Sequence, residues 1–321
     1  MALNLAPILD QLSERNRERG AEMHVATMTL VVLFEDETIG KLARDRIRML
    51  ASKHPSRVVV LDACRDERVA HVENDDWIEI GAKGAKPEVL RDWVCALHIR
   101  DAPIVLLWIA SGIGEDSRFA MLSELAETIV YNSSLVDNGH AALCELFEYI
   151  EQHPHLPLAD VAYLRLVPWQ ECVATFFDGK DADELRDVRQ VEVACGSEPE
   201  GFYLLGWLAS RLQWTPTSAD ALLDREGKTV TFQMRLEGEP RRVRRVALVT
   251  SSSQYVAEID ESGETILLSV SGSSRHGQRY RAIKNPGIAA LLEHAILWSR
   301  NDRVFQHALA AAGQILACRK D

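Results

Sequence analysis

The sequence lacks the signals that would direct this chain to a membrane or out of the cell. No stretch reaches the roughly 18 apolar residues that a membrane-spanning helix needs. The first residues contain no basic region followed by an apolar run, as a secretory signal would. We therefore expect a cytoplasmic protein with no membrane partner.

Paired cysteines and an excess of positive charge are also missing. The cysteines, six in number, are scattered without a Cys-x-x-Cys pair, which argues against a zinc site and a dithiol redox motif. The formal net charge of −12 opposes approach to a phosphate backbone, so we expect no nucleic-acid partner. One local exception is a set of four arginines within residues 241–245, which we interpret as a solvated turn and strand start.

No stretch of the sequence forms a recognisable catalytic motif. The glycines near Ser111 lack the third glycine of a dinucleotide fingerprint, and the serines at 251–253 do not form a Gly-x-Ser-x-Gly elbow. His153 and His155 have no further metal ligand at a recognisable spacing, which favours a loop. We expect no catalytic residue, cofactor or metal, and hence a protein that is not an enzyme.

The patterns that are present predict an α/β protein of two domains. At 321 residues, with 47% hydrophobic and 26% charged residues, the chain exceeds the usual size of a single core. Continuous apolar runs at 28–34 and 57–62, with a helix between them, suit a parallel pair of buried strands. Only about a dozen residues then precede residues 77–81, which predicts an antiparallel strand and a mixed sheet.

After the proline-rich connector 153–157 the pattern changes to alternation. A strand at 188–195 and a helix at 201–212 precede successive strands at 229–236, 243–250, 255–259 and 265–270, which read as an antiparallel meander with one solvated face. Two helices, 286–299 and 303–317, would cover the other face. The predicted fold is therefore an N-terminal mixed-sheet α/β domain, 1–157, followed by an α+β domain with C-terminal helices, 158–321.

Acidic residues follow the predicted parallel strands, at the edge where open α/β sheets bind ligands. Glu35, Asp36 and Glu37 follow the first strand, and Asp62 ends the second. These carboxylates could hold a magnesium ion. Asp36 and Thr38 could instead cap a helix N-terminus, and the residues leave both interpretations open.

Four segments carry a resemblance to a known family. They are 54–60 (His-Pro-Ser-Arg-Val-Val-Val), 101–108 (Asp-Ala-Pro-Ile-Val-Leu-Leu-Trp), 164–169 (Leu-Arg-Leu-Val-Pro-Trp) and 206–212 (Gly-Trp-Leu-Ala-Ser-Arg-Leu). In this order, over about residues 20–215, the chain resembles the OpcA family of glucose-6-phosphate dehydrogenase assembly proteins. The resemblance is strongest in residues 160–178, where Pro168 and Trp169 read as a strand-to-helix junction.

The resemblance implies a non-catalytic assembly factor and allosteric activator of glucose-6-phosphate dehydrogenase. Such a protein would promote the active oligomer of the enzyme and NADPH production in the oxidative pentose phosphate pathway. Trp108, Arg165 and Trp169 are candidate contact residues, since Trp and Arg are favoured at interface hot spots. The competing hypothesis is a small-ligand or metal-dependent enzyme or sensor that uses Glu35, Asp36 and Asp62. The sequence leaves the chain's own oligomeric state open.

Overall fold

The structure of the chain is a computed structural model. It describes residues 5–19, 26–66, 69–73, 76–178, 184–272, 276–282, 286–298 and 302–319. The chain divides into two compact units. The first comprises Met1–Leu135, Pro154–Ala159 and Ile288–Arg300, and the second Val136–His153, Asp160–Gly287 and Asn301–Asp321. The domain limits 1–157 and 158–321 stay a prediction.

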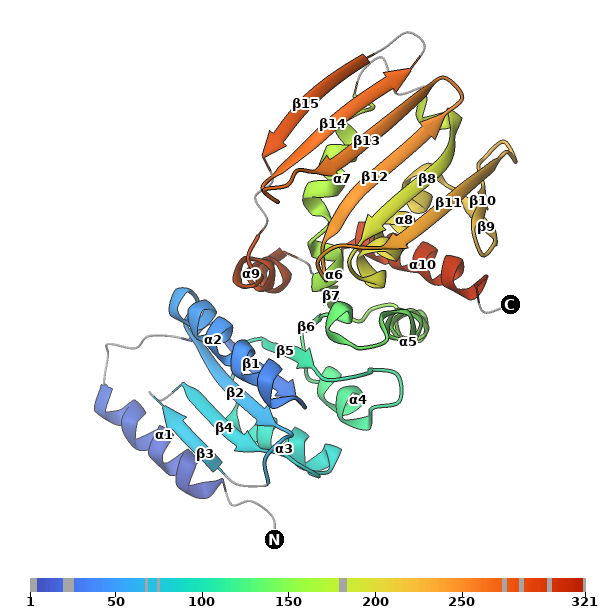
Figure 1. The fold of residues 1–321 in the computed structure, drawn as a ribbon. Coiled ribbons are helices and arrows are strands. Elements are labelled where there is room, and N and C mark those ends of the chain that lie inside the picture. The colour runs from blue at the N-terminus through green and yellow to red at the C-terminus, as the bar shows by residue number, and fades with distance from the viewer. Residues whose placement is uncertain are drawn as a thin grey trace. The chain divides into compact units, whose positions relative to one another are not determined.

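A seven-stranded sheet lies at the centre of the first unit, with the strand order β3-β4-β2-β1-β5-β6-β7 (Figure 1). Its strands are β1 (Met28–Phe34), β2 (Ser56–Asp62), β3 (Val69–Glu73), β4 (Trp77–Gly81), β5 (Ile104–Ile109), β6 (Thr128–Tyr131) and β7 (Leu158–Asp160). β1 pairs in parallel with β2 on one side and β5 on the other. Every residue of β1 is buried, as expected of a continuous apolar run in a covered parallel sheet.

Helices pack on both faces of this sheet. The helices of the first unit are α1 (Ala6–Arg19), α2 (Glu37–Lys53), α3 (Pro87–Leu97), α4 (Ser117–Ser123) and α9 (Ile288–Trp298). α2 contacts β1, β2 and α9, whereas α3 contacts β2 and α4. The crossover from β1 through α2 to β2 and the crossover from β4 through α3 to β5 run in opposite directions across the sheet. Because both are right-handed, α2 and α3 lie on opposite faces. The strand order consequently reverses between β1 and β5.

The prediction for residues 77–81 is wrong in direction, although the mixed sheet is confirmed. β4 runs parallel to β2, and the antiparallel strand is β3, which pairs with β4 at the edge of the sheet. The segment between β2 and β4 needs no crossover helix, because β3 runs antiparallel to β4 and returns the chain to the other end of the sheet. β4 can then run in the direction of β2.

An eight-stranded sheet forms the second unit, with the order β15-β14-β13-β12-β8-β11-β10-β9. The strands are β8 (Val188–Cys195), β9 (Thr215–Ser218), β10 (Ala221–Leu223), β11 (Thr229–Leu236), β12 (Val243–Thr250), β13 (Ser253–Ile259), β14 (Thr265–Gly272) and β15 (His276–Ala282). β12 to β15 form the expected antiparallel meander. β8 inserts between β12 and β11 and pairs with β11 in parallel, so β11 is not part of that meander.

Helices cover one face of this second sheet, as Figure 1 shows. The helices of the second unit are α5 (Gly139–Gln152), α6 (Val161–Leu164), α7 (Val167–Thr175), α8 (Glu198–Leu212) and α10 (Arg303–Ala317). α8 packs on β8, on α10 and on α5. The other face carries exposed residues that alternate with buried ones along β11, which is the pattern of a strand with one face toward solvent.

Two further expectations need correction. α9 was expected on the meander together with α10, but it packs against α2 and β6 of the first unit. Pro168 does lie in the first turn of a helix, but α6 rather than a strand precedes α7. Both errors concern which element lies next to a helix, and the apolar face of a helix alone does not specify its neighbour.

The fold class itself is confirmed, since a parallel-sheet α/β unit precedes a unit built on a mixed sheet with an antiparallel meander. Within the described ranges, no helix is long and apolar enough to cross a lipid bilayer.

Candidate functional site

Open α/β sheets bind ligands at the carboxyl ends of the strands where the strand order reverses. In this sheet those are the ends of β1 and β5. Glu35 follows β1, and its Oε2 accepts hydrogen bonds from the backbone N–H and the hydroxyl of Ser111. Its Oε1 accepts from Arg118, which also binds Asp116. A network of ion pairs and hydrogen bonds therefore joins the side chains at this edge of the sheet.

Arg118 and Asp116 each stabilise the charged form of the other. Burial works to raise the pKa of Asp116, but hydrogen bonds from the Arg118 guanidinium and backbone N–H bring it below its ordinary value. The hydrogen bonds that Arg118 donates to Asp116, and then to Glu35, raise the pKa of Arg118. Both groups stay ionised and occupied with one another.

Asp36 caps α2, as one of the two interpretations of the acidic residues predicted. Its side chain accepts a hydrogen bond from Ile39 N at 2.7 Å. This interaction satisfies one of the free amides at the helix N-terminus, which would otherwise attract an anion. The neighbouring Glu37 pairs with Arg65 at 2.9 Å.

Asp62 at the end of β2 is part of a buried polar network. Its Oδ2 accepts from Arg44 Nη2 at 2.7 Å, and Arg44 Nε donates to Glu79 at 3.1 Å. Trp77 Nε1 donates to the same oxygen of Glu79 at 2.9 Å. A buried carboxylate with charged and hydrogen-bonded partners is a structural element of this core.

Arg44 was missed by the sequence analysis although a signal for it exists. Gly40, Arg44 and Ile47 lie at helical spacing on the buried face of α2. An arginine on such a face requires a buried acid, and Asp62 was available one strand away.

These side chains do not suit a phosphate-bearing cofactor or a metal ion. Three consecutive carboxylates stand at the N-terminus of α2, where a pyrophosphate would need free backbone N–H groups. Asp36 and Asp62, the proposed metal ligands, accept from a backbone N–H and from Arg44. Among the described residues, no group of three or more His, Cys, Asp or Glu is placed to hold a metal.

The signature segment 160–178 is built around buried polar contacts in the second unit. Asp160 caps α6 by accepting from Ala162 N at 2.8 Å, and it also accepts from the hydroxyl of Tyr203 at 2.8 Å. Arg165 pairs with the fully buried Glu200 of α8 at 3.0 Å. These contacts attach α6 and the start of α7 to α8.

The three candidate contact residues lie mostly below the surface. Trp108 is 1% exposed, donates from Nε1 to Gly112 O and packs edge-on against Phe119. Trp169 is 5% exposed, and the Arg165 side chain is 15% exposed. That they contact a partner stays a prediction, and their burial favours support of a surface over direct contact.

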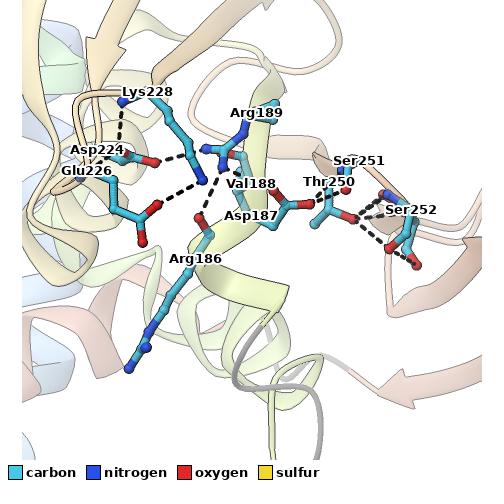
Figure 2. Close-up of polar contacts among 11 residues, drawn as sticks. Arg186, Asp187, Val188, Arg189, Asp224, Glu226, Lys228, Thr250, Ser251 and Ser252 are labelled. Atoms are coloured by element: carbon cyan, nitrogen blue, oxygen red, sulfur yellow. Dashed lines mark hydrogen bonds and ion pairs between the residues drawn. The ribbon is translucent and has the colours of Figure 1, made fainter.

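A cluster of ion pairs around Arg189 joins three segments of the second unit (Figure 2). Arg189 donates to Asp224 at 2.9 Å and to Asp187 at 3.0 Å. Asp187 in turn accepts from the backbone N–H and the hydroxyl of Ser251. Ser251 and Ser252 thus lie in the turn between β12 and β13, as expected of a turn after a strand, and Ser253 begins β13.

His153 and the arginine strip also have structural roles. His153 follows α5 as its C-cap and stacks on Tyr149 at a ring distance of 4.3 Å. β12 begins at Val243, and Arg245 pairs with Glu192 at 2.7 Å. The interpretation of residues 241–245 as a turn and strand start is therefore confirmed.

The fold of this chain is similar to that of solved α/β oxidoreductases. KijD10, a 3-ketoreductase from Actinomadura kijaniata in complex with TDP-benzene and NADP, aligns with a TM-score of 0.56 at 10% identity over 91% of this chain and 96% of that chain. An oxidoreductase from Sinorhizobium meliloti gives a TM-score of 0.55 at 10% identity with the same coverage. At this identity the likeness concerns the fold alone.

Sequence comparison points to one family. Residues 156–309 match the family model for the C-terminal domain of the glucose-6-phosphate dehydrogenase subunit OpcA. A "Putative OxPP cycle protein OpcA" of Nostoc punctiforme is 30% identical over 146 residues, which are 44% of this chain and 31% of that protein. Its namesake in Synechocystis sp. is 31% identical over 128 residues, 39% of this chain and 26% of that protein.

These matches confirm the resemblance to the OpcA family that the sequence predicts, and the family model extends it through the meander. The aligned segments span less than a third of the curated relatives' own length.

Proposed function

We propose that this protein is a non-catalytic assembly factor and allosteric activator of glucose-6-phosphate dehydrogenase. The match of residues 156–309 to a family described by association with that enzyme is the observation that carries the proposal. The names of the relatives relate the family to the OxPP cycle. In this role the chain raises NADPH production in the oxidative pentose phosphate pathway, in the cytoplasm.

The ion pairs of the first unit support a role without chemistry. A reductase of this fold needs a place for the phosphates of its cofactor beside β1, and here that place holds Glu35 with Ser111 and Arg118. The alternative is an enzyme or sensor that binds a ligand through Glu35, Asp36 and Asp62, and the oxidoreductase fold favours it. Such a ligand would have to displace contacts that already satisfy all three carboxylates.

Activation follows from preferential binding. A protein that binds one conformation or oligomer of the dehydrogenase more tightly than another shifts the population toward it. Each tenfold preference supplies about 1.4 kcal/mol of that shift. No group of this chain needs to enter the active site of the enzyme.

Titration of purified glucose-6-phosphate dehydrogenase with the full chain tests the proposal. We expect a saturable rise in rate and co-elution of the two proteins in size-exclusion chromatography. Unchanged kinetics together with separate elution would contradict it.

A variant separates the proposal from the sensor alternative. Glu35→Gln keeps the shape of the side chain and removes its charge. An enzyme or sensor that binds its ligand at the strand ends would lose ligand binding in this variant, whereas an assembly factor would keep its activation of the dehydrogenase. Circular dichroism establishes that the variant is folded.

A further inference from the structure

A hollow on the second unit brings three arginines together from separate parts of the chain. Arg186 comes from the 3₁₀ helix η3 (Glu184–Asp187), Arg211 from the last turn of α8, and Arg225 from the turn between β10 and β11. All three line one hollow of about 390 Å³. Nothing in their sequence spacing indicates that they meet.

No carboxylate neutralises these three guanidinium groups within the part of the chain that the structure describes. Arg186 provides only its backbone carbonyl to Arg189, and Figure 2 shows its side chain extending away from the ion pairs around Arg189. An arginine stays charged at any physiological pH. In a chain with a net charge of −12, three arginines in one hollow that have no acidic partner among the described residues are an unusual concentration of positive charge.

The two carboxylates in the lining of the hollow are already neutralised. Asp224 pairs with Arg189 at 2.9 Å and accepts the backbone N–H groups of Glu226 and Lys228. Glu226 pairs with Lys228 at 2.8 Å. The C-terminal end of α8 contributes a partial negative charge of about one half, which three arginines outweigh. The lining therefore has a net positive charge.

The remainder of the lining is apolar. Trp214, Leu185 and Leu212 complete it, and Trp214 is itself buried. An apolar floor with a few convergent charged groups is the composition of a small-molecule site, and the volume lies within the range of about 300–1,000 Å³ that such sites have.

We propose that this hollow binds a small phosphate monoester. A phosphate monoester presents three terminal oxygens and a charge of about −1.5 to −2 at neutral pH. Planar guanidinium groups bind such oxygens through paired N–H donors. Leu185, Leu212 and Trp214 contact the organic part of the molecule. The site is independent of the partner proposed above, because its lining lies within one unit and needs no second protein.

Isothermal titration calorimetry with the full chain at physiological ionic strength tests the site. The probes are inorganic phosphate and glycerol phosphate, with glycerol as the neutral control. We expect saturable binding of the monoester with one molecule per chain, weaker binding of inorganic phosphate, and none of glycerol. Arg211→Gln and Arg225→Gln each weaken binding about tenfold, the loss expected for a hydrogen bond to a charged group.

Arg279→Gln is the matched control. It removes the same charge from an exposed arginine on β15, outside the hollow, and leaves the affinity unchanged. Absence of saturable phosphate binding overturns the proposal, and so does equal affinity in the wild type and the two hollow variants. Hexaglutamate that binds more tightly than the monoester, with the same dependence on Arg211, would identify a site for an acidic peptide and also overturn it.

Discussion

For Trp169, the residue type suggests a partner contact, whereas the position in the fold shows a buried side chain. As a tryptophan beside an arginine it fits the composition of an interface hot spot. Its place in the first turns of α7, 5% exposed, assigns the side chain to the core of the second unit. A buried tryptophan acts on a partner only through the elements that it supports.

We expect Trp169→Ala to lower the free energy of unfolding by about 3–5 kcal/mol, the usual cost of removing a buried aromatic side chain. Urea denaturation followed by circular dichroism measures the change. Trp169→Phe, which keeps most of the apolar volume, should cost much less. A fully stable Trp169→Ala protein that no longer activates the dehydrogenase would instead show that Trp169 contacts the partner.

Asp187 contributes to stability in a way that depends on pH. The side-chain hydrogen bond from Ser251, followed by the one from the Ser251 backbone, lowers the pKa of this carboxyl. Because the folded pKa lies below that of the unfolded chain, the stabilisation is present above pH of about 4 and is lost as the pH falls through the folded pKa.

Ser251→Ala should therefore destabilise the protein at pH 7 by less than about 1 kcal/mol, since Asp187 is close to solvent. The difference from wild type should shrink as the pH falls below the folded pKa of Asp187. Urea midpoints across the acid range measure this. In an Asp187→Asn background the same substitution should show no such pH dependence, and a constant difference in both backgrounds would exclude the mechanism.

At the scale of elements, the contact between α8 and α10 depends on a glycine. A Cβ on Gly206 would lie 2.2 Å from the backbone oxygen of Ala308 and 2.8 Å from Ala312 N. Backbone atoms cannot move aside as a flexible side chain can. The two helices can therefore approach this closely only with glycine at position 206.

Gly206→Ala should lower the free energy of unfolding by about 1–3 kcal/mol through overpacking. This sign is opposite to the usual effect, because alanine is favoured over glycine by about 1 kcal/mol in a helix interior. Thermal and urea unfolding measure the change. Gly277→Ala on β15, where a Cβ would meet nothing within 4 Å, is the control with little expected effect. A stabilised Gly206→Ala protein would show that the helices can separate at no cost.

At the scale of the whole molecule, the family match suggests which residues face a partner. Tyr280 on the edge strand β15 is 72% exposed and lies within the matched residues 156–309. Leu42 on α2 is 60% exposed and lies outside them. Large apolar side chains on a surface are candidates for protein contacts.

If the dehydrogenase binds through the matched segment, Tyr280→Glu should weaken the complex about tenfold or more. Leu42→Glu should leave it unchanged. Surface plasmon resonance with immobilised enzyme measures both, and the same variants report on activation in the rate assay. The opposite result, with only Leu42→Glu impaired, would place the contact in the first unit.

Much of the fold could be predicted because its elements have strong local patterns. The apolar runs of β1 and β2 have the length and the valine content of buried strands, and Asp36 before the apolar face of α2 marks a helix start. The order of the strands in the second sheet could not be predicted in the same way. β8 lies between β11 and β12 although the helix α8 and two strands separate β8 from β11 along the chain, and no local pattern encodes that insertion.

The sequence by itself determined the α/β class, the family resemblance and the absence of a recognisable catalytic motif, since these follow from periodicity, spacing and residue type. Only the tertiary structure decided which side chains meet. It buried Trp108 and Trp169, placed α9 in the first unit and gathered Arg186, Arg211 and Arg225 around one hollow. The physical reason is that burial and charge pairing depend on contacts between distant segments, and these form only when the elements pack.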